Sequence, residues 1–257
     1  MVTVIFPAAG KGSRMQAGMN KIFMSLGGVP ILLRTLLQYS GCEGVDQLVV
    51  VVAAGEVEFV TSILGRLTGL KPYKVVAGGS ERQYSVLKGI NSIDGRADDI
   101  ILVHDAARPF VSEGTITAVI RAAKQYGGAI AAVAAKNTIK VCDDEGVVVD
   151  TPARSSLWEI QTPQGFSRQI LLEANDMAQR DGFLGTDDAS LVERTGHRVH
   201  IVESDYRNIK ITTPEDILIG EAFIQNQGNS PLIEQNSQAM AEINRLIYDC
   251  WQKEKTI

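Results

Sequence analysis

Cysteine and histidine are scarce in this chain of 257 residues, which holds three of each. Cys42, Cys142 and Cys250 are odd in number and far apart, which argues against a disulfide framework and favours a reducing compartment. His197 and His200 are separated by two residues, and on a strand such a pair would face opposite sides. We therefore expect neither a disulfide-stabilised fold nor a metal site built from these residues.

Long apolar runs and an excess of positive charge are also missing. The longest apolar runs, near 48–54 and 129–135, have the length of strands and are too short to cross a bilayer. The N-terminus has no basic region followed by an apolar core, so we predict a cytoplasmic protein that is not exported. The net charge is −5. Since nucleic-acid binding depends on dense Lys and Arg, we expect no nucleic-acid partner, whereas small phosphorylated ligands are not excluded because they need only a local cluster of cations.

Strand-like and helix-like segments alternate over the first 135 residues. The strand segments are almost continuously apolar and β-branched, as in 48–52, which is typical of strands buried on both faces of a sheet. The alternation predicts a doubly wound α/β fold with a mostly parallel sheet flanked by helices. The expected strands are 2–6, 47–53, 73–77, 99–104 and 128–134, and the expected helices are about 30–40, 56–68, 82–92 and 113–126.

The pattern changes after residue 135. Residues 136–153 alternate around the turn signal 143–146, which predicts a β-hairpin arm that projects from the main sheet. A lone hairpin is marginal in water, so we expect it to pack on another surface, naturally a second subunit. The remaining expected elements are helices at 167–180 and 187–195, strands near 198–203 and 208–211, and a helix with Thr213 as N-cap and Pro214 in its first turn.

The C-terminal region has a different composition. Residues 225–237 are polar and contain glycine, which predicts a linker. Beyond it, apolar residues from Met240 to Trp251 recur at helical spacing, as in an amphipathic helix that packs on its own body or on a neighbouring subunit. We therefore divide the chain into a domain of residues 1–225, with the arm at about 136–153, and a linker plus helix at 226–257.

The first strand ends in a loop of small residues, 7–13, and the cations Lys11, Arg14 and Lys21 lie in or just beyond it. Small residues let backbone N–H groups approach an anion and nearby cations add charge, as a triphosphate requires. The loop is not a Walker A motif, and a dinucleotide fingerprint from Gly10 would need Gly or Ala where Met15 stands. The alternative is a glycine-rich turn shaped only by the fold.

Two more loops follow strands of the predicted sheet. Gly78 and Gly79 precede Ser85, whose hydroxyl could meet a base edge; the alternative is an N-capped turn into a helix. Asp105 and Arg108 follow a buried strand. Asp105 could meet Mg²⁺ or a substrate hydroxyl and Arg108 a phosphate, and the alternative is a mutual salt bridge.

Two later positions complete the candidate site. Thr186 precedes a predicted helix and could either cap it or hold a phosphate at its N-terminus. Lys210 lies on the expected strand 208–211, where it would point away from Ile209 and Ile211. The alternative for Lys210 is a solvated lysine.

Together these motifs resemble the 2-C-methyl-D-erythritol 4-phosphate cytidylyltransferases of the non-mevalonate isoprenoid pathway. They appear in family order over about residues 1–225 and are specific jointly, although none is specific alone. Residues from about 226 onward exceed the usual family length. The matching motifs are Pro7-Ala8-Ala9-Gly10 through Arg14 and Lys21, Gly78-Gly79 through Ser85, His104 through Pro109, Arg154 with Leu157-Trp158, Thr162-Pro163-Gln164, Thr186-Asp187 and Asn208-Ile209-Lys210.

The resemblance implies a Rossmann-like fold, CTP as the donor, Mg²⁺ dependence and a homodimer joined through the arm. Carried over by position, it also implies a role for each site residue. The cytidine and its phosphates would be surrounded by Ala8, Ala9, Gly10, Gly12, Gly79 and Ser85. Phosphate oxygens at the reacting centre would be bound by Arg14, Lys21 and Lys210. The methylerythritol phosphate would be held by Asp105, Arg108 and Thr186, with Thr138 and Arg154 reaching it from the neighbouring subunit's arm, and Asp105 is also the candidate metal ligand.

The implied chemistry explains why no catalytic His or Cys pair is needed. A phosphate monoester has a second pKa of about 6 and is already an oxyanion at neutral pH. The enzyme has to bring two anions together and stabilise charge on the α-phosphate, which positioned cations and Mg²⁺ can do.

Three other functions are weighed against this one. A cytidylyltransferase for ribitol 5-phosphate, or a related polyol phosphate, would share the nucleotide loops and differ in the sugar pocket. A nicotinamide-dependent oxidoreductase is disfavoured because the third glycine and the ribose-binding acid are missing. A non-catalytic nucleotide-binding module is disfavoured by Arg14, Lys21 and Lys210.

Overall fold

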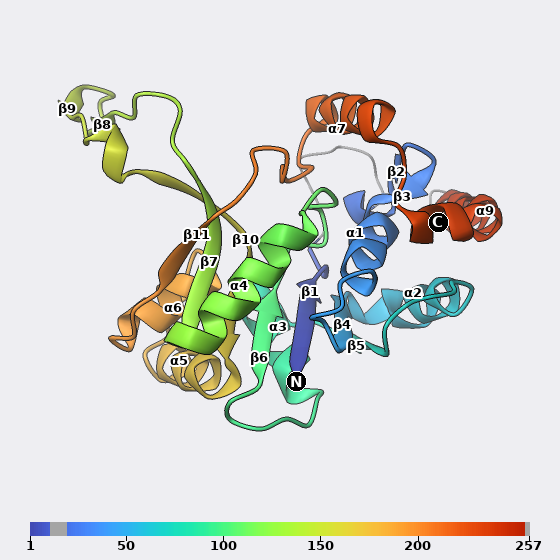
Figure 1. Cartoon of the computed structure of the whole chain (residues 1–257), viewed down its shortest axis with the longest axis horizontal. Coiled ribbons are helices and arrows are strands. Elements are labelled where there is room, and N and C mark those ends of the chain that lie inside the picture. The colour runs from blue at the N-terminus through green and yellow to red at the C-terminus, as the bar shows by residue number, and fades with distance from the viewer. Residues whose placement is uncertain (11–19, 255–257) are drawn as a thin grey trace.

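The central element is a seven-stranded sheet (Figure 1). The computed structural model describes residues 1–10 and 20–254, with side chains as far as residue 252. Every strand pair of the sheet is parallel except the two made by β10, which is antiparallel to both neighbours. The mostly parallel α/β fold is therefore confirmed. In spatial order the strands are β11 (His200–Glu203), β7 (Gly128–Ala134), β10 (Trp158–Ser167), β6 (Ile100–Val103), β1 (Val2–Pro7), β4 (Gln47–Val52) and β5 (Tyr73–Ala77).

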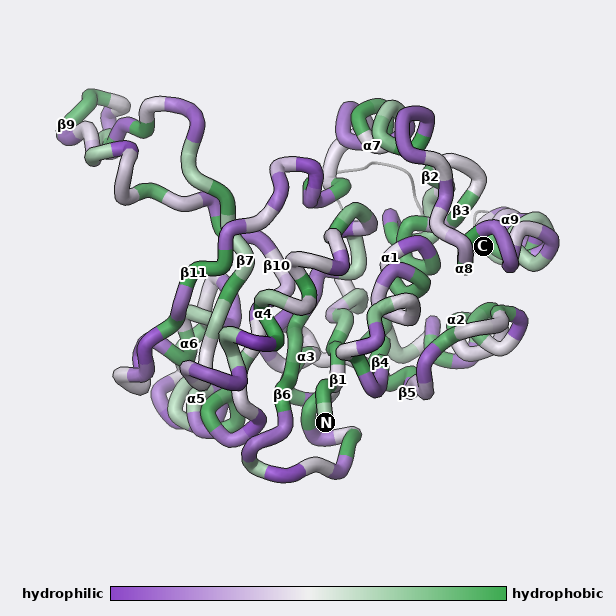
Figure 2. Tube along the Cα trace, in the orientation of Figure 1, coloured by the Kyte–Doolittle hydropathy of each residue, from purple (hydrophilic) through white to green (hydrophobic). Residues whose placement is uncertain are grey.

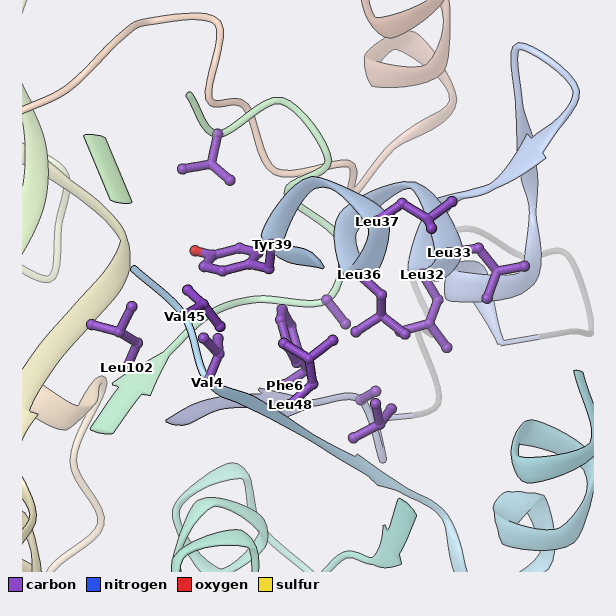
Figure 3. Packing of buried hydrophobic residues seen from close by; sticks show 14 of the residues in the cluster. Val4, Phe6, Leu32, Leu33, Leu36, Leu37, Tyr39, Val45, Leu48 and Leu102 are labelled. Carbon is purple, nitrogen blue, oxygen red and sulfur yellow. The ribbon is translucent and has the colours of Figure 1, made fainter. Parts of the chain in front are cut away.

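Helices cover both faces of the sheet because side chains alternate along its buried strands. On β1, Val4 and Phe6 belong to one apolar cluster and Ile5 belongs to another. The first cluster includes α1 (Ile31–Ser40), α2 (Val57–Leu64) and α4 (Glu113–Tyr126). Figure 3 shows leucines of α1 packed near Phe6 and Leu48. The second includes α3 (Arg82–Asn91), α5 (Arg168–Arg180) and α6 (Asp188–Arg194). Each fully buried Leu, Ile or Phe contributes roughly 1.5–3 kcal/mol by leaving water.

The sequence pattern predicts no strand at residues 158–167, yet β10 lies between β6 and β7. Its pairing with β7 is irregular between Ile160 and Gln164. The stretch holds Gln161, Pro163 and Gln164, which do not form an apolar strand pattern. Gly165 lies so close to β6 that a Cβ there would approach Leu102 Cδ2 to 2.8 Å.

The predicted arm is present and extends away from the sheet (Figure 1). It carries β8 (Val141–Cys142) and β9 (Val148–Asp150), which pair antiparallel. The Asp143 side chain accepts hydrogen bonds from the backbone N–H groups of Glu145 and Val147 and so fixes the turn. Green, hydrophobic positions continue along the arm in Figure 2. Its exposed apolar side chains are Ile139, Val141, Val147, Val148 and Val149.

The C-terminal region is more helical than expected. α7 (Pro214–Gln227) begins at Thr213, whose capping box with Asp216 confirms the predicted start. The expected linker at 225–237 is wrong, because α7 runs to Gln227 and α8 (Pro231–Gln235) follows. α9 (Ser237–Glu254) buries Met240, Ile243 and Ile247 in the cluster that contains α1, so the predicted amphipathic helix packs on its own body.

Short elements connect the main ones. β2 (Ser25–Leu26) and β3 (Val29–Pro30) form a small hairpin before α1. The 3-10 turns of the described residues are Lys21–Phe23, Ala54–Glu56 and Arg154–Ser156. The expected strand 208–211 is wrong, because residues 204–213 form turns and irregular chain. Within the described part of the chain, no helix is both long and apolar enough to span a membrane.

Candidate active site

A cavity of about 300 Å³ lies at the carboxyl ends of β1, β5 and β6. Ligands of doubly wound folds collect at this edge, and the three loops predicted to meet there do so. Residues 20–22, Lys210 and Thr212 add to its lining from other parts of the chain. Its described lining comprises Pro7, Ala8, Ala9, Gly10, Asn20, Lys21, Ile22, Gly79, Ser80, Glu81, Arg82, Ser85, Asp105, Ala106, Ala107, Lys210 and Thr212.

The first loop continues the direction of β1. The backbone N–H of Ala8 donates to the Val51 carbonyl at 2.7 Å, which extends the pairing of β1 with β4 past the end of the strand. A Cβ at Gly10 would meet no described atom within 4 Å, so packing against the described chain does not require glycine there. Gly12 and Arg14 lie outside the described residues, and their predicted roles stay predictions.

Small residues allow the first two loops to touch. A Cβ on Gly78 would approach the Cβ of Ala9 to 2.6 Å, and one on Gly79 would approach the Cβ of Tyr84 to 2.6 Å. The Gly79 N–H donates to Ser85 Oγ at 3.0 Å, and the Ser85 hydroxyl donates to the Glu81 carbonyl at 3.0 Å. Ser85 therefore holds this loop, although it is not the N-cap of α3, which is Glu81.

Asp105 gathers three cationic side chains. Its Oδ2 lies 3.0 Å from Lys210 Nζ and 3.1 Å from Arg108 Nε, and its Oδ1 lies 3.9 Å from Arg82 Nε. Burial raises the pKa of Asp105, but the attraction of Lys210, Arg108 and Arg82 outweighs burial and holds that pKa well below its usual range. The Asp105–Arg108 salt bridge that the sequence offered as the alternative is present, and Lys210 is an ion-pair partner rather than a fully solvated lysine.

Arg82 and Asp188 form an ion pair that the sequence does not predict. Arg82 Nη2 lies 2.7 Å from Asp188 Oδ2, and the Asp188 side chain is 1% exposed. Burial raises the pKa of Asp188 and the Arg82 charge opposes that rise. The only sequence signals were an arginine just after the Gly78-Gly79 turn and a pair of acids before a predicted helix, and neither signal links the two positions.

Lys21 reaches the cavity from the other side. Its Nζ donates to the Ile211 carbonyl at 2.9 Å, next to Lys210 in the chain. Asn20 fixes the turn that carries Lys21, because its side chain donates to the Ala8 carbonyl at 3.2 Å and accepts from the Ile22 N–H at 3.4 Å. Two lysines far apart in the sequence thus line one cavity, as predicted.

Asn208 and His104 hold Arg108 in place. Arg108 Nη1 donates to the Asn208 carbonyl at 2.7 Å, and the Asn208 amide donates to the Thr162 carbonyl at 2.8 Å. His104 is fully buried, and its ring nitrogens contact Thr162 Oγ1 at 3.1 Å and the Arg108 carbonyl at 3.0 Å. Burial lowers the pKa of His104 to about 3, so the imidazole is neutral and supports Arg108 without exchanging protons at neutral pH.

Three predicted substrate residues lie apart from this cavity. Thr186 is exposed and is not among the described lining residues, and Asp187 rather than Thr186 caps α6 by accepting from the Ser190 N–H at 2.9 Å. Thr138 is exposed on the arm. Arg154 lies at the base of the arm, where its Nη1 donates to the Lys136 carbonyl at 3.2 Å. The single chain does not bring the arm residues to the cavity.

The described residues contain no group of three or more His, Cys, Asp and Glu side chains that could hold a metal ion. Asp105 Oδ2 is shared by Lys210 and Arg108, so a metal there would have to displace an ion pair and sit among cations. This geometry disfavours the predicted metal role of Asp105. A Mg²⁺ ion in this cavity would need most of its ligands from the substrate's phosphates and from water.

Comparison with known proteins places this fold and cavity in a family. Residues 2–226 match the sequence profile described as 2-C-methyl-D-erythritol 4-phosphate cytidylyltransferase. A protein of that name from Geobacter metallireducens is 46% identical over 229 residues, which cover 88% of this chain and 98% of the relative. Another from Geobacillus kaustophilus is 47% identical over 221 residues, covering 86% of this chain and 95% of the relative.

Solved structures agree with the sequence match. The crystal structure of 4-diphosphocytidyl-2C-methyl-D-erythritol synthase from Anaerococcus prevotii has a TM-score of 0.78 at 31% identity and covers 88% of this chain and 96% of its own. The corresponding cytidylyltransferase from Thermus thermophilus has a TM-score of 0.72 at 31% identity, with coverages of 87% and 98%. The matched residues include the whole described lining of the cavity, from Pro7 to Thr212. The chain therefore belongs to the 2-C-methyl-D-erythritol 4-phosphate cytidylyltransferase family.

Proposed function

We propose that the cavity binds CTP beside 2-C-methyl-D-erythritol 4-phosphate and that the chain transfers CMP between them. The products are CDP-methylerythritol and pyrophosphate. The observation that carries the proposal is the convergence of Lys21, Lys210 and Arg82 on one cavity at the carboxyl edge of the sheet, with Arg108 paired to Asp105 in its lining. Family membership supports the choice of both substrates.

The reaction requires two anions to meet. An oxygen of the methylerythritol phosphate forms a bond to the α-phosphorus of CTP, and the bond from that phosphorus to the bridging oxygen of the β-phosphate breaks. The attacking oxygen is already charged at neutral pH, so no residue has to remove a proton. Lys21 and Lys210 stabilise the charge that builds on the α-phosphate, which is the dominant contribution in reactions of this kind.

The small-residue loops accept the nucleotide. Ala8, Ala9 and Gly10 leave the backbone of the first loop open to phosphate oxygens, and Gly79 and Ser85 form the wall on which the base rests. Arg14 and Gly12, in the same loop, are proposed to complete the phosphate contacts.

Asp105 and Arg108 serve the second substrate. Asp105 holds Lys210 and Arg108 close together before substrate arrives. Its ionised carboxylate can accept hydrogen bonds from the polyol hydroxyls, and Arg108 can pair with the phosphate. Thr186, from the loop before α6, is proposed to contact the same phosphate when substrate is bound.

Mg²⁺ is proposed to enter with CTP. The described cavity offers cations and backbone groups rather than a carboxylate cage, so phosphate oxygens rather than Asp105 are the proposed ligands. The ion would neutralise part of the triphosphate charge. Asp105→Asn should then raise KM for the polyol phosphate and leave the Mg²⁺ concentration for half-maximal activity unchanged.

A homodimer is proposed to complete the site. Thr138 and Arg154 stand on or beside an arm that extends from the body, and this arm exposes Val147, Val148 and Val149. Packing against a second copy would cover these residues and bring the two polar side chains to its cavity. A cytoplasmic location stays a prediction from the sequence.

The proposed function is tested by pyrophosphate release with four nucleoside triphosphates crossed against several polyol phosphates. We expect the highest kcat/KM for CTP with 2-C-methyl-D-erythritol 4-phosphate, and no turnover without a divalent cation. Faster turnover of ribitol 5-phosphate would support the alternative polyol. Faster turnover of ATP in place of CTP would overturn the nucleotide assignment.

A further inference from the structure

A second cavity lies beside α1 and shares no lining residue with the substrate cavity in the described chain. It measures about 340 Å³, a size that suits a small ligand, and α1, the 109–113 loop and the C-terminal end of α7 border it. Residues 228–230 and Ile233 close it, and they lie outside the region that matches the family. This cavity is therefore formed jointly by the family fold and the segment that follows it.

Arg34 on α1 is a buried cation beside this cavity. Arg34 is only 4% exposed. Among the described residues, no carboxylate forms an ion pair with it. Its Nη1 donates to Asn229 Oδ1 at 3.0 Å and its Nη2 to the Leu26 carbonyl at 2.9 Å, so only neutral acceptors surround it. Burial lowers the pKa of Arg34 to about 10, which leaves it charged at neutral pH.

Two polar atoms at this cavity are enclosed without a hydrogen-bond partner in the described chain. They are Nε of Arg34 and Oγ of Ser230. Buried polar groups are normally satisfied, and a buried arginine is normally paired with an acid. An uncompensated guanidinium beside a cavity is the arrangement that an anionic ligand completes.

The remaining lining defines the ligand's other features. Phe110 and Phe223 present an edge-to-face aromatic pair with centroids 5.4 Å apart, which suits an apolar body. Arg207 also borders the cavity, but Asp205 already pairs with it at 2.7 Å. Glu113 adds a negative charge. Arg34 without an acidic partner, and with Glu113 on the same lining, suits a ligand with one negative charge. A phosphate monoester, which carries nearly two negative charges at neutral pH, suits it less well.

We propose that this cavity, here called the Arg34 cavity, is a binding site for a small carboxylate with an aromatic or branched apolar body. The carboxylate pairs with Arg34 and accepts from Ser230, and the apolar body rests against Phe110 and Phe223. The proposal is independent of the cytidylyl transfer reaction, since none of these residues lines the substrate cavity in the described chain.

The probe is 4-fluorobenzoate, titrated against the protein by fluorine NMR, with 4-fluorobenzyl alcohol as the neutral analogue and 4-fluorophenyl phosphate as the dianionic one. We expect saturable binding of the carboxylate at least tenfold tighter than that of the alcohol. Equal affinity for the alcohol would overturn the role of Arg34. Tighter binding of the phosphate would overturn the assignment to a carboxylate.

Variants locate the bound probe. Arg34→Met should weaken 4-fluorobenzoate binding at least tenfold, whereas Lys210→Met, in the substrate cavity, should leave it unchanged within twofold. If Lys210→Met loses the probe and Arg34→Met keeps it, the carboxylate binds among the substrate-site cations and the proposal is wrong.

A second variant avoids any dependence on how Arg34→Met folds. Gln38 lies one turn after Arg34 on α1 and borders the same cavity, so Gln38→Glu places a carboxylate at i+4. This internal acid should compete with the ligand, abolish 4-fluorobenzoate binding and raise the Tm by satisfying Arg34. Unchanged probe affinity in a folded Gln38→Glu protein would overturn the proposal.

Discussion

Asp105 is the residue on which the charges of the candidate active site converge. Three cations surround it, so its carboxylate stays ionised and the cations stay near each other although each would repel the others alone. A substrate phosphate that enters this cluster meets positive charge already held in place. Positioning the cations therefore costs little free energy when the reaction begins.

Replacing Lys21 or Lys210 by alanine should mainly lower the catalytic rate. Each ammonium group faces charge that grows during attack, so we expect each change to cost roughly 2–4 kcal/mol of transition-state stabilisation. Steady-state kinetics of the two variants measure this loss. Lys124→Ala, on the exposed side of α4, is the matched control and should keep normal turnover. Near-normal turnover of either cavity variant would show that its proposed catalytic role is wrong.

Arg82→Gln should destabilise the fold by leaving Asp188 buried without its partner. Breaking such a pair costs up to about 3–5 kcal/mol, and we expect the lower part of that range because the Arg82 side chain is 33% exposed. Asp188→Asn added to Arg82→Gln should restore much of the loss, since it removes the uncompensated charge. Urea unfolding of the single and double variants measures both steps. If the double variant is no more stable than Arg82→Gln, the unpaired charge of Asp188 is not the cause of the destabilisation.

The same pair predicts a pH dependence. Without Arg82 nothing opposes the effect of burial, so the folded-state pKa of Asp188 rises further above its unfolded value. A group with a raised folded pKa favours folding at low pH, and that benefit is lost as pH rises through the folded pKa. The free-energy difference between the wild type and Arg82→Gln should therefore be smaller at pH 5 than at pH 8. An equal difference at both values would contradict the assignment.

At the scale of elements, the C-terminal helix α9 is a structural part of the body. It buries Ile243 completely against the cluster that holds α1, and the Asn236 side chain before it bonds the backbone of Thr68 through both its oxygen, at 2.8 Å, and its nitrogen, at 3.0 Å. Ile243→Ala should lower the free energy of unfolding by about 2–5 kcal/mol. Tyr248→Ala, on the same helix but 56% exposed, is the control and should change little. Equal, small effects of both changes would mean that α9 does not stay docked in solution.

The elements that the sequence predicted best are those whose pattern is local. The apolar strands β1, β4, β5 and β7 and the helices α1 and α4 carry continuous or periodic signals, and their observed bounds lie within one residue of the expected ones. β10 could not be found this way, because its pairing on both edges compensates for a polar, proline-containing sequence. Lys210 lines the cavity but does not lie on the strand expected at 208–211, because contacts to Asp105 and Ala107 rather than sheet pairing hold residues 210 and 211.

The site residues also divide into those that the local sequence predicts and those that depend on packing between distant segments. Loops that follow parallel strands were predictable, because the topology brings their carboxyl ends together. The Arg82–Asp188 pair was not, since it depends on how α3 and α6 pack on one face of the sheet. The buried state of His104 and the local hydrogen bonds of Ser85 also depend on neighbours far along the chain or on exact geometry.

At the scale of the whole molecule, the arm predicts a site shared between two chains. Lys21→Ala and Arg154→Ala should each inactivate the proposed homodimer, and co-expression should restore activity. With crossed arms, one site of each mixed dimer collects both defects while the other is intact. With arms that serve their own chain, every site keeps one defect. Mixed dimers can be isolated through two different affinity tags, and their activity distinguishes these cases. Inactive mixed dimers would refute the shared site. They would not affect the assignment of CTP as the nucleotide.

The position of β10 constrains how the chain can assemble as it leaves the ribosome. Strands β1, β4, β5 and β6 all lie within the first 103 residues and can pair with one another early in synthesis. The free edge of β6 is then an open row of backbone groups beside apolar residues such as Ile101, until β10 is made at residues 158–167 and covers it. β7, although synthesised earlier, joins the sheet only through β10. A nascent chain stalled inside the arm would therefore expose an unpaired, aggregation-prone edge of β6.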